Sequence, residues 1–251
     1  MYPIAFQLGA LTIRWYGVMA ALGFLSAVFL LNKNRKFANL SKDQCSTMLL
    51  LALLFGILGA RIFYVIQFFH YFQYDLAKVF RIDQGGLVFY GGFLLALGAV
   101  IIYSWRQKLD IIRVLDVLAP TMAIAHCFGR IGCFLNGCCF GRATGFWWGI
   151  GPLPGSDLAL RAGTLPLHPV QLLEAGENLL LALLYCWMLR HTKRGVVVAS
   201  FFIFYGTLRF FNEMLRGDNV LYFNLTPAQW IGLLLIPAGI GLLIIFRHER
   251  A

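Results

Sequence analysis

The stretch HCFGRIGCFLNGCCFGR, residues 126–142, carries a cationic side chain, Arg130, into an otherwise apolar segment. An arginine near the middle of a membrane costs at least about 2.5–3.5 kcal/mol on insertion scales, so it normally faces a bundle interior or a wet cavity and has a partner or a task. The same stretch contains several glycines, which let a neighbouring backbone or a ligand approach closely. The pattern predicts the wall of a site inside a membrane.

The composition of the whole chain supports that location. Of the 251 residues, 60% are hydrophobic and 13% are charged, whereas soluble domains are roughly 45–50% apolar. The mean hydropathy is +0.74. A formal net charge of +10 would suggest nucleic acid as the partner of a soluble protein, but the basic residues lie mostly in short loops between apolar runs. We therefore expect a polytopic membrane protein and no nucleic acid partner.

Apolar runs along the chain are each long enough for one crossing of about 20 residues. They cover residues 13–31, 45–69, 86–105, 114–140, 169–189, 196–215 and 227–246. The runs predict an all-α fold with seven transmembrane helices in a single integral-membrane domain over residues 1–251. A short N-terminal interfacial arm and a loop or head region between spans four and five complete the prediction. The arm lacks a basic region and a small-residue cleavage pattern, so no removable signal peptide is expected.

Basic residues are distributed unevenly between the two sides of this arrangement. The loops after spans one, three and five, together with the C-terminus, hold more than half of the 21 Lys and Arg residues. Because cytoplasmic loops carry an excess of basic residues, the N-terminus is expected outside and the C-terminus inside. Topology does not explain the arginines that lie in or beside spans toward the outer side, which are Arg61, Arg130, Arg142, Arg209 and Arg216.

One helix face would carry Arg209, Glu213 and Arg216, so Glu213 could hold both guanidinium groups while they face an anion. A planar guanidinium offers phosphate two parallel donors. With Arg130 and Arg142 added, the pattern favours a phosphate site, and lipid headgroups are the phosphates available in a membrane. The alternative is a charge-balanced structural network that uses Glu213, Glu174 and Asp116.

Other residues of interest have a structural interpretation beside the functional one. Arg61 lies about two-thirds along the second run, where an interfacial or structural role is favoured over a site role. Tyr16 begins the first run, as interfacial aromatic residues do. For the glycine pairs on both sides of Tyr90, helix packing and a site are equally open. Capping and interface contacts are favoured for a set spaced by three residues, His168, Gln171 and Glu174.

Cysteines cluster in the central stretch, at positions 127, 133, 138 and 139. Such a cluster could bind a metal, form a redox pair or pack as apolar side chains. The spacing is not a paired C-x-x-C, and adjacent cysteines such as Cys138 and Cys139 seldom ligate one ion together. Cysteines in an apolar segment usually behave as small hydrophobes, so packing is favoured, with no metal and no cofactor expected. A disulfide that involves Cys138 or Cys139 is an alternative if that end faces an oxidising compartment.

The motifs resemble those of the bacterial prolipoprotein diacylglyceryl transferase family, in order over nearly the whole chain. They are RWYG (14–17), GGLVFYGG (85–92), GRIGCFLNGCCFGR (129–142), HPVQLLE (168–174) and RFFNEMLRGD (209–218). The resemblance implies an inner-membrane transferase of lipoprotein biosynthesis, with the N-terminus and the head region periplasmic and the C-terminus cytoplasmic. Such an enzyme moves the diacylglyceryl group from phosphatidylglycerol to the lipobox cysteine thiol of a preprolipoprotein, forming a thioether and releasing glycerol phosphate. Phosphatidylglycerol, preprolipoproteins and membrane lipids are its expected partners.

The resemblance also implies roles for individual residues. Arg130 would bind the lipid phosphate and Arg209 would assist the reaction, with Glu213 and Arg216 in support. Further residues expected at the phospholipid are Tyr16, Asn136, Gly141 and Arg142. The alternatives are a paralogue that uses another acceptor and a non-catalytic phospholipid-binding or transport protein that uses the same arginines.

The chain departs from the family pattern at three positions. Many members have His in place of Tyr90, and Asn and Glu in place of Cys133 and Cys138. A tyrosine has a reference pKa of about 10, so Tyr90 could act as a base only if nearby arginines activate it strongly. We expect Tyr90 to take part in catalysis by positioning the phosphate or the thiol through its hydroxyl, while arginine electrostatics lower the pKa of the thiol.

Overall fold

The computed structural model describes residues 3–9, 11–81, 85–153, 156–217 and 222–248. Among these residues, seven helices are long and apolar enough to cross a membrane. They are α1 (Trp15–Asn34), α2 (Lys42–Gln67), α3 (Phe89–Arg106), α4 (Ile111–Asn136), α6 (Val170–His191), α7 (Val196–Leu215) and α8 (Pro227–His248). The predicted all-α polytopic membrane fold is thereby confirmed. The helix expected to continue to residue 140 ends earlier, at Asn136, because Gly137 turns the backbone with φ of 74°.

The N-terminal arm is a β-hairpin. Strand β1 (Ile4–Leu8) pairs antiparallel with β2 (Leu11–Arg14), and Ile4 lies opposite Arg14. The backbone N–H of Trp15 donates to the carbonyl of Pro3 at 3.0 Å, so the hairpin leads directly into α1. The first span therefore starts at Trp15 rather than at residue 13. An interfacial location of this arm stays a prediction.

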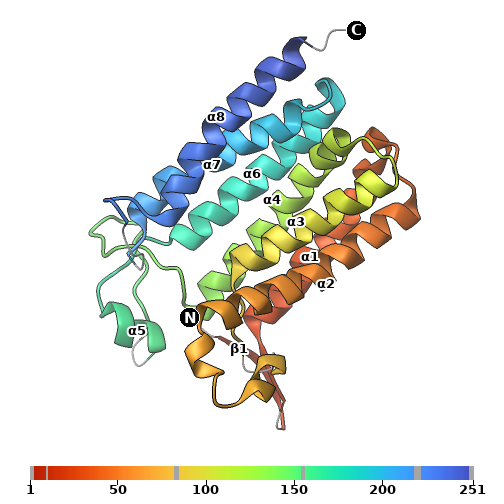
Figure 1. The fold of residues 1–251 in the computed structure, drawn as a ribbon. Coiled ribbons are helices and arrows are strands. Elements are labelled where there is room, and N and C mark those ends of the chain that lie inside the picture. The colour runs from red at the N-terminus through yellow and green to blue at the C-terminus, as the bar shows by residue number, and fades with distance from the viewer. Residues whose placement is uncertain (1–2, 10, 82–84, 154–155, 218–221, 249–251) are drawn as a thin grey trace. The chain divides into compact units, whose positions relative to one another are not determined.

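The chain divides into two compact units, one formed by Met1–Phe37 with Leu115–Ala251 and the other by Ala38–Val114. In the first unit, α7 packs against both α6 and α8, and these helices lie side by side (Figure 1). The short helix α5 (Asp157–Ala162) belongs to the loop that joins α4 to α6 (Figure 1). The core of this unit includes fully buried residues from three helices, namely Val117, Tyr185 and Ala199.

A buried carboxylate joins α4 to the start of α7. Asp116, on α4, accepts hydrogen bonds from the backbone N–H groups of Gly195 at 2.7 Å and Val198 at 2.8 Å. The first N–H groups of a helix have no partner within the helix, and the helix dipole favours a negative charge there. Asp116 therefore fixes the N-terminal end of α7 against α4.

In the second unit, α2 and α3 pack against each other through glycines. A Cβ atom at Gly91 would overlap the Phe63 side chain and the Gly59 carbonyl, and one at Gly92 would overlap the carbonyl of Gly56. Small residues of this kind let two transmembrane backbones approach closely. The packing interpretation therefore accounts for the glycine pair that follows Tyr90.

Arg61, also in the second unit, organises the segment between α2 and α3. This segment contains the short 3₁₀ helices η2 (Phe69–Tyr71) and η3 (Leu76–Phe80). The buried Arg61 guanidinium donates hydrogen bonds of 2.6–3.1 Å to backbone carbonyls of Lys78, Val79, Arg81, Gly85 and Gly86. Arg61 donates its hydrogen bonds to carbonyls of the loop. This is a structural role, as the sequence favours.

Candidate functional site

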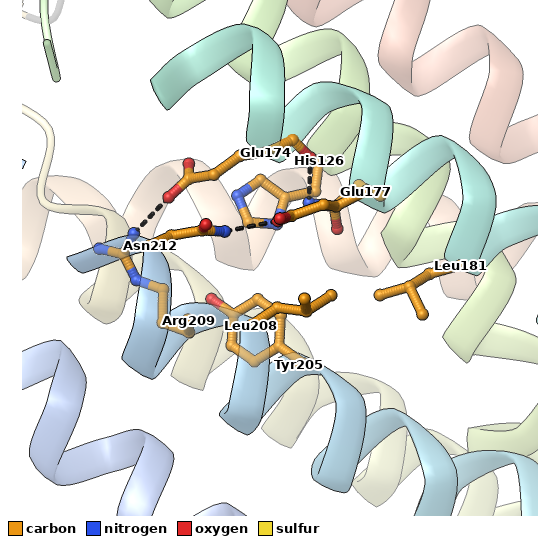
Figure 2. Close-up of a pocket in the computed structure, with 9 residues that line it drawn as sticks. His126, Glu174, Glu177, Leu181, Tyr205, Leu208, Arg209 and Asn212 are labelled. Atoms are coloured by element: carbon orange, nitrogen blue, oxygen red, sulfur yellow. Dashed lines mark hydrogen bonds and ion pairs between the residues drawn. The ribbon is translucent and has the colours of Figure 1, made fainter. Parts of the chain in front are cut away.

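The candidate site is centred on the carboxylate of Glu174, which lies between guanidinium groups from two other helices. Oε2 of Glu174, on α6, lies 2.5 Å from Nε of Arg130 on α4. Oε1 accepts a hydrogen bond of 2.8 Å from Nη1 of Arg209 on α7, as Figure 2 shows. The Glu174 side chain is 4% exposed and each arginine 12%. One buried anion thus joins three transmembrane helices.

The two arginines are held differently. Nη2 of Arg209 lies 3.0 Å from Oε2 of Glu213, one turn further along α7, so carboxylates fix this guanidinium on two sides. Nε of Arg130 also donates to Nε2 of His126 at 3.0 Å. In the part of the chain that the structure describes, the terminal nitrogens of Arg130 have no hydrogen-bond partner. Arg130 therefore keeps the parallel donors that suit a phosphate.

A polar pocket adjoins this cluster. Its lining, drawn in Figure 2, comes from α4, α6 and α7 and consists of His126, Glu174, Glu177, Asn178, Leu181, Tyr205, Leu208, Arg209 and Asn212. Nδ2 of Asn212 donates to Oε2 of Glu177 at 2.5 Å, and Nδ2 of Asn178 donates to the carbonyl of Glu174 at 2.7 Å. Such a concentration of polar side chains within spans is expensive in a membrane and identifies a candidate functional site.

The segment after α4 is held between the start of α6 and the end of α7. The N–H of Gly141 donates to the His168 carbonyl at 3.1 Å, and the N–H of Arg142 donates to the Leu215 carbonyl at 2.8 Å. Nε of Arg142 reaches the carbonyl of Arg216 at 3.0 Å. A Cβ atom at Gly141 would overlap the backbone of His168. Gly141 therefore lets this segment fit between the two helix ends.

Tyr16 and Asn136 both lie near the C-terminal part of α4. Tyr16 is on α1, and Asn136 belongs to α4 itself. A Cβ atom at Gly132 would contact the ring of Tyr16, so α1 packs its half-exposed Tyr16 against α4 two residues beyond Arg130. Asn136 is the last residue of α4, and its Nδ2 donates to Sγ of Cys138 at 3.7 Å. Both residues therefore lie in the same unit as Arg130.

Three cysteines gather at the end of α4. The Sγ atoms of Cys133, Cys138 and Cys139 all lie within 4.8 Å of one another. All six cysteines of the chain are free thiols. Hydrogen bonds with the thiols of Cys133 and Cys138, together with the cationic neighbours Arg216 and Arg130, lower the pKa of the Cys139 thiol. The cluster is therefore a set of soft ligands beside guanidinium groups.

Comparison with known proteins shows which proteins this chain is similar to. The family model described as prolipoprotein diacylglyceryl transferase matches residues 3–245. The chain belongs to this family. Among the similar proteins, the phosphatidylglycerol--prolipoprotein diacylglyceryl transferase of Pseudoalteromonas translucida (strain TAC 125) is 38% identical over 96% of this chain and 91% of its own length. The protein of the same name from Clostridium tetani (strain Massachusetts / E88) is 35% identical over 100% of both chains.

In this member of the prolipoprotein diacylglyceryl transferase family, the structure gathers some of the residues predicted from sequence in one compact unit, and another belongs to the second unit. Arg130, Arg209 and Glu213 belong to the cluster around Glu174, and Arg142 contacts the backbone of Arg216. Tyr90 is the second residue of α3, in the other compact unit, where its side chain is 44% exposed. Its catalytic role stays a prediction.

Glu174, the central residue of the site, is not among the site residues predicted from the sequence. The sequence favours capping contacts for Glu174 and offers a charge-balanced network as the alternative, and the ion pairs of its carboxylate with Arg130 and Arg209 agree with that alternative. The signal was present, because a carboxylate within a transmembrane run is costly without a partner. His126 and the Glu177–Asn212 pair were also not singled out, and only the structure shows that their helices face one another.

Proposed function

We propose that this protein transfers the diacylglyceryl group of phosphatidylglycerol to the lipobox cysteine thiol of preprolipoproteins and releases glycerol phosphate. The relatives' names supply the two substrates, and one observation in this chain carries the proposal. That observation is the pair of terminal donors on Arg130, whose Nε is fixed within a membrane span by Glu174 and His126. A lipid phosphate is the anion that such a guanidinium meets at that depth.

The proposal gives separate tasks to the two arginines. Arg130 binds the phosphate of the lipid through its terminal nitrogens. Arg209, held by Glu174 and Glu213, maintains the carboxylate that orients Arg130 and adds positive charge where the leaving phosphate gains negative charge. Arg142, Arg216, Tyr16, Asn136 and Gly141 form the surroundings proposed for the headgroup.

The reaction forms one bond and breaks another. The thiolate sulfur of the acceptor attacks the glyceryl carbon that carries the phosphate, and the electron pair of the broken C–O bond stays on the phosphate oxygen. Because a free thiol has a pKa of about 8.5, the acceptor must lose its proton before it attacks. Preorganised guanidinium groups stabilise the departing phosphate without reorganisation during the step.

The membrane proposed for this reaction is the bacterial inner membrane. The distribution of basic residues favours a periplasmic N-terminus and a cytoplasmic C-terminus. This orientation puts the turn after α4 and the loop that contains α5 on the periplasmic side. Preprolipoproteins translocated across the membrane would meet the site from that side.

The test measures transfer of labelled diacylglycerol from phosphatidylglycerol to a lipobox peptide by the purified protein. Replacing either cluster arginine, as Arg130→Ala or Arg209→Ala, is expected to lower turnover by about 100-fold or more, as loss of a preorganised donor does. Arg106→Ala removes an exposed arginine at the end of α3 and should leave turnover unchanged.

Two results would contradict the proposal. If well-folded wild-type protein produced no labelled peptide and no glycerol phosphate with several lipids, the non-catalytic lipid-binding alternative would replace it. If a peptide with Ser in place of the lipobox Cys were labelled equally well, the acceptor would not be a thiol.

A further inference from the structure

We propose that Cys133, Cys138 and Cys139 bind a divalent cation of the zinc type, and that its open coordination position activates the acceptor thiol. The role of the cation rests on the proposed transfer reaction, whereas the cation site itself does not. The inference departs from the sequence-based expectation that these cysteines only pack, because their sulfur atoms converge in the structure.

The sulfur positions fit a small soft cation. Zn–S bonds are about 2.3 Å long, which places the sulfurs of a tetrahedral site about 3.8 Å apart. The three Sγ atoms lie within 4.8 Å of one another, so movements of about 1 Å would complete the coordination. Three protein ligands leave the fourth position of a tetrahedral zinc ion open, as in catalytic zinc sites.

The backbone explains how adjacent cysteines can point to one centre. Cys139 has φ of 60°, a conformation that non-glycine residues adopt rarely and that concentrates at functional sites. The N–H of Cys138 donates to the carbonyl of Cys133 at 3.1 Å, which closes the turn at the end of α4. The turn therefore brings both neighbouring sulfurs beside the sulfur of Cys133.

Side chains around the turn form hydrogen bonds with Cys138, as the residues that surround the ligands of a metal site commonly do. Nδ2 of Asn136 donates to Sγ of Cys138 at 3.7 Å, and Nε2 of Gln171 donates to the Cys138 carbonyl at 2.8 Å. Gln171 is 1% exposed, and within the described residues its Oε1 has no hydrogen-bond partner. Metal ligands are oriented by such outer hydrogen bonds, and a buried acceptor without a partner suits an additional bound group.

Charge also favours an occupied site. Three thiolates and one divalent cation carry a net charge of −1, and the cationic neighbours of Cys139 are Arg216 and Arg130. The complex is thus balanced by guanidinium groups that already belong to the site. Thiolate ligands select zinc and other soft cations over magnesium or calcium.

The chemistry of the cation complements that of Arg130. A thiol that coordinates zinc is deprotonated, so the proton of the acceptor passes to water when the thiol enters the open position. The bound sulfur then forms the C–S bond to the glyceryl carbon as the C–O bond to phosphate breaks. The electron pair goes to the phosphate oxygen at Arg130, and the zinc ion is neither oxidised nor reduced.

The first experiment measures metal content in the intact protein. Wild-type protein purified without chelator and given zinc is expected to retain about one ion per chain. Cys133→Ser, Cys138→Ser and Cys139→Ser should each lower zinc affinity by about 10-fold or more. Cys186→Ser, a cysteine outside the cluster, is the matched control and should retain the ion.

Cobalt provides a readout that is independent of activity. Protein loaded with Co²⁺ should show thiolate-to-cobalt charge-transfer absorption, which the three variants lose and Cys186→Ser keeps. A lipobox peptide should change this spectrum, whereas the same peptide with Ser in place of Cys should not, because only a thiol occupies the open position.

The outcomes separate this inference from the proposed function. Transfer without bound metal, with all three variants active, would overturn the cation site and leave the transferase proposal standing. If the thiolate-to-cobalt absorption were present but the protein catalysed no transfer, the cation site would stand and its role in transfer would be overturned. If the lipobox peptide left the cobalt absorption spectrum unchanged, the acceptor thiol would not occupy the open coordination position. Transfer that a chelator abolishes and zinc restores is the expected result.

Discussion

At the level of single residues, Glu174 determines how the two arginines coexist. Arg130 and Arg209 both lie within ion-pair distance of its carboxylate, so their like charges would repel each other without it. Removing one partner from a buried ion pair leaves an uncompensated charge, which is more costly than the absence of the whole pair. The carboxylate therefore matters for stability and for the orientation of Arg130.

Glu174→Gln is expected to lower the free energy of unfolding by about 3 kcal/mol and to abolish most transfer activity. The matched control is Glu177→Gln, on the same helix, because an amide at position 177 can still accept from Asn212. Thermal unfolding in detergent and the transfer assay measure both effects. Equal losses in the two variants would show that Glu174 is only one of several interchangeable carboxylates.

Some of these residues could be predicted from sequence and others could not. Arg130 and Arg209 stand out because a guanidinium within an apolar run requires a task. Periodicity places Glu174 on a helix face, but it does not say which helix that face meets. His126 sits one turn before Arg130 on α4, and its contact depends on the side-chain direction that the packed helices impose.

At the level of elements, the segment between α4 and α6 depends on the absence of a side chain at Gly141. Gly141→Ala is expected to displace this segment from His168, with a cost of about 1–3 kcal/mol and a clear loss of transfer. Gly145→Ala is the control, since nothing lies within 4 Å of a Cβ atom built there. Unfolding midpoints and activity distinguish them, and a fully active Gly141→Ala protein would contradict the prediction.

The segment between α2 and α3 depends in the same way on Arg61. Arg61→Lys removes the forked donors, and each lost charge-assisted hydrogen bond is worth about 1.5–3 kcal/mol. We expect lower stability and faster proteolysis between α2 and α3. Lys78→Ala, which removes an exposed side chain paired with Asp75, should change stability by less than about 1 kcal/mol. Limited proteolysis compares the variants, and equal cleavage would argue against this role for Arg61.

The helices could be predicted from hydropathy because a span must satisfy its backbone internally over a fixed membrane thickness. The positions of the helix ends were predicted less accurately. The fourth run stays apolar to residue 140, but the backbone at Gly137 ends α4 at Asn136. The hairpin of the arm was not predicted, because its pairing depends on the backbone register between Ile4 and Arg14 rather than on composition.

For the whole molecule, seven crossings would place the two chain ends on opposite sides of the membrane. We expect an N-terminal reporter to be active in the periplasm and a C-terminal reporter to be active in the cytoplasm, following the distribution of basic residues. Reporter fusions after α4 and after α6 serve as internal controls, because the first is expected in the periplasm and the second in the cytoplasm. Finding both ends on one side would mean that one of the seven helices does not cross.

Asp116 has a further consequence for the dimensions of the site. It joins α4 to α7 at Gly195, and fourteen residues then lead from Asp116 to Arg130, as fourteen lead from Gly195 to Arg209. At 1.5 Å per residue, both helices rise about 21 Å over that length, so the two guanidinium groups come level by equal spacing. Deleting one residue from either count would shift its arginine by about 1.5 Å and rotate it by about 100°. Two helix segments of equal length, counted from one shared contact, thus set the depth of both arginines.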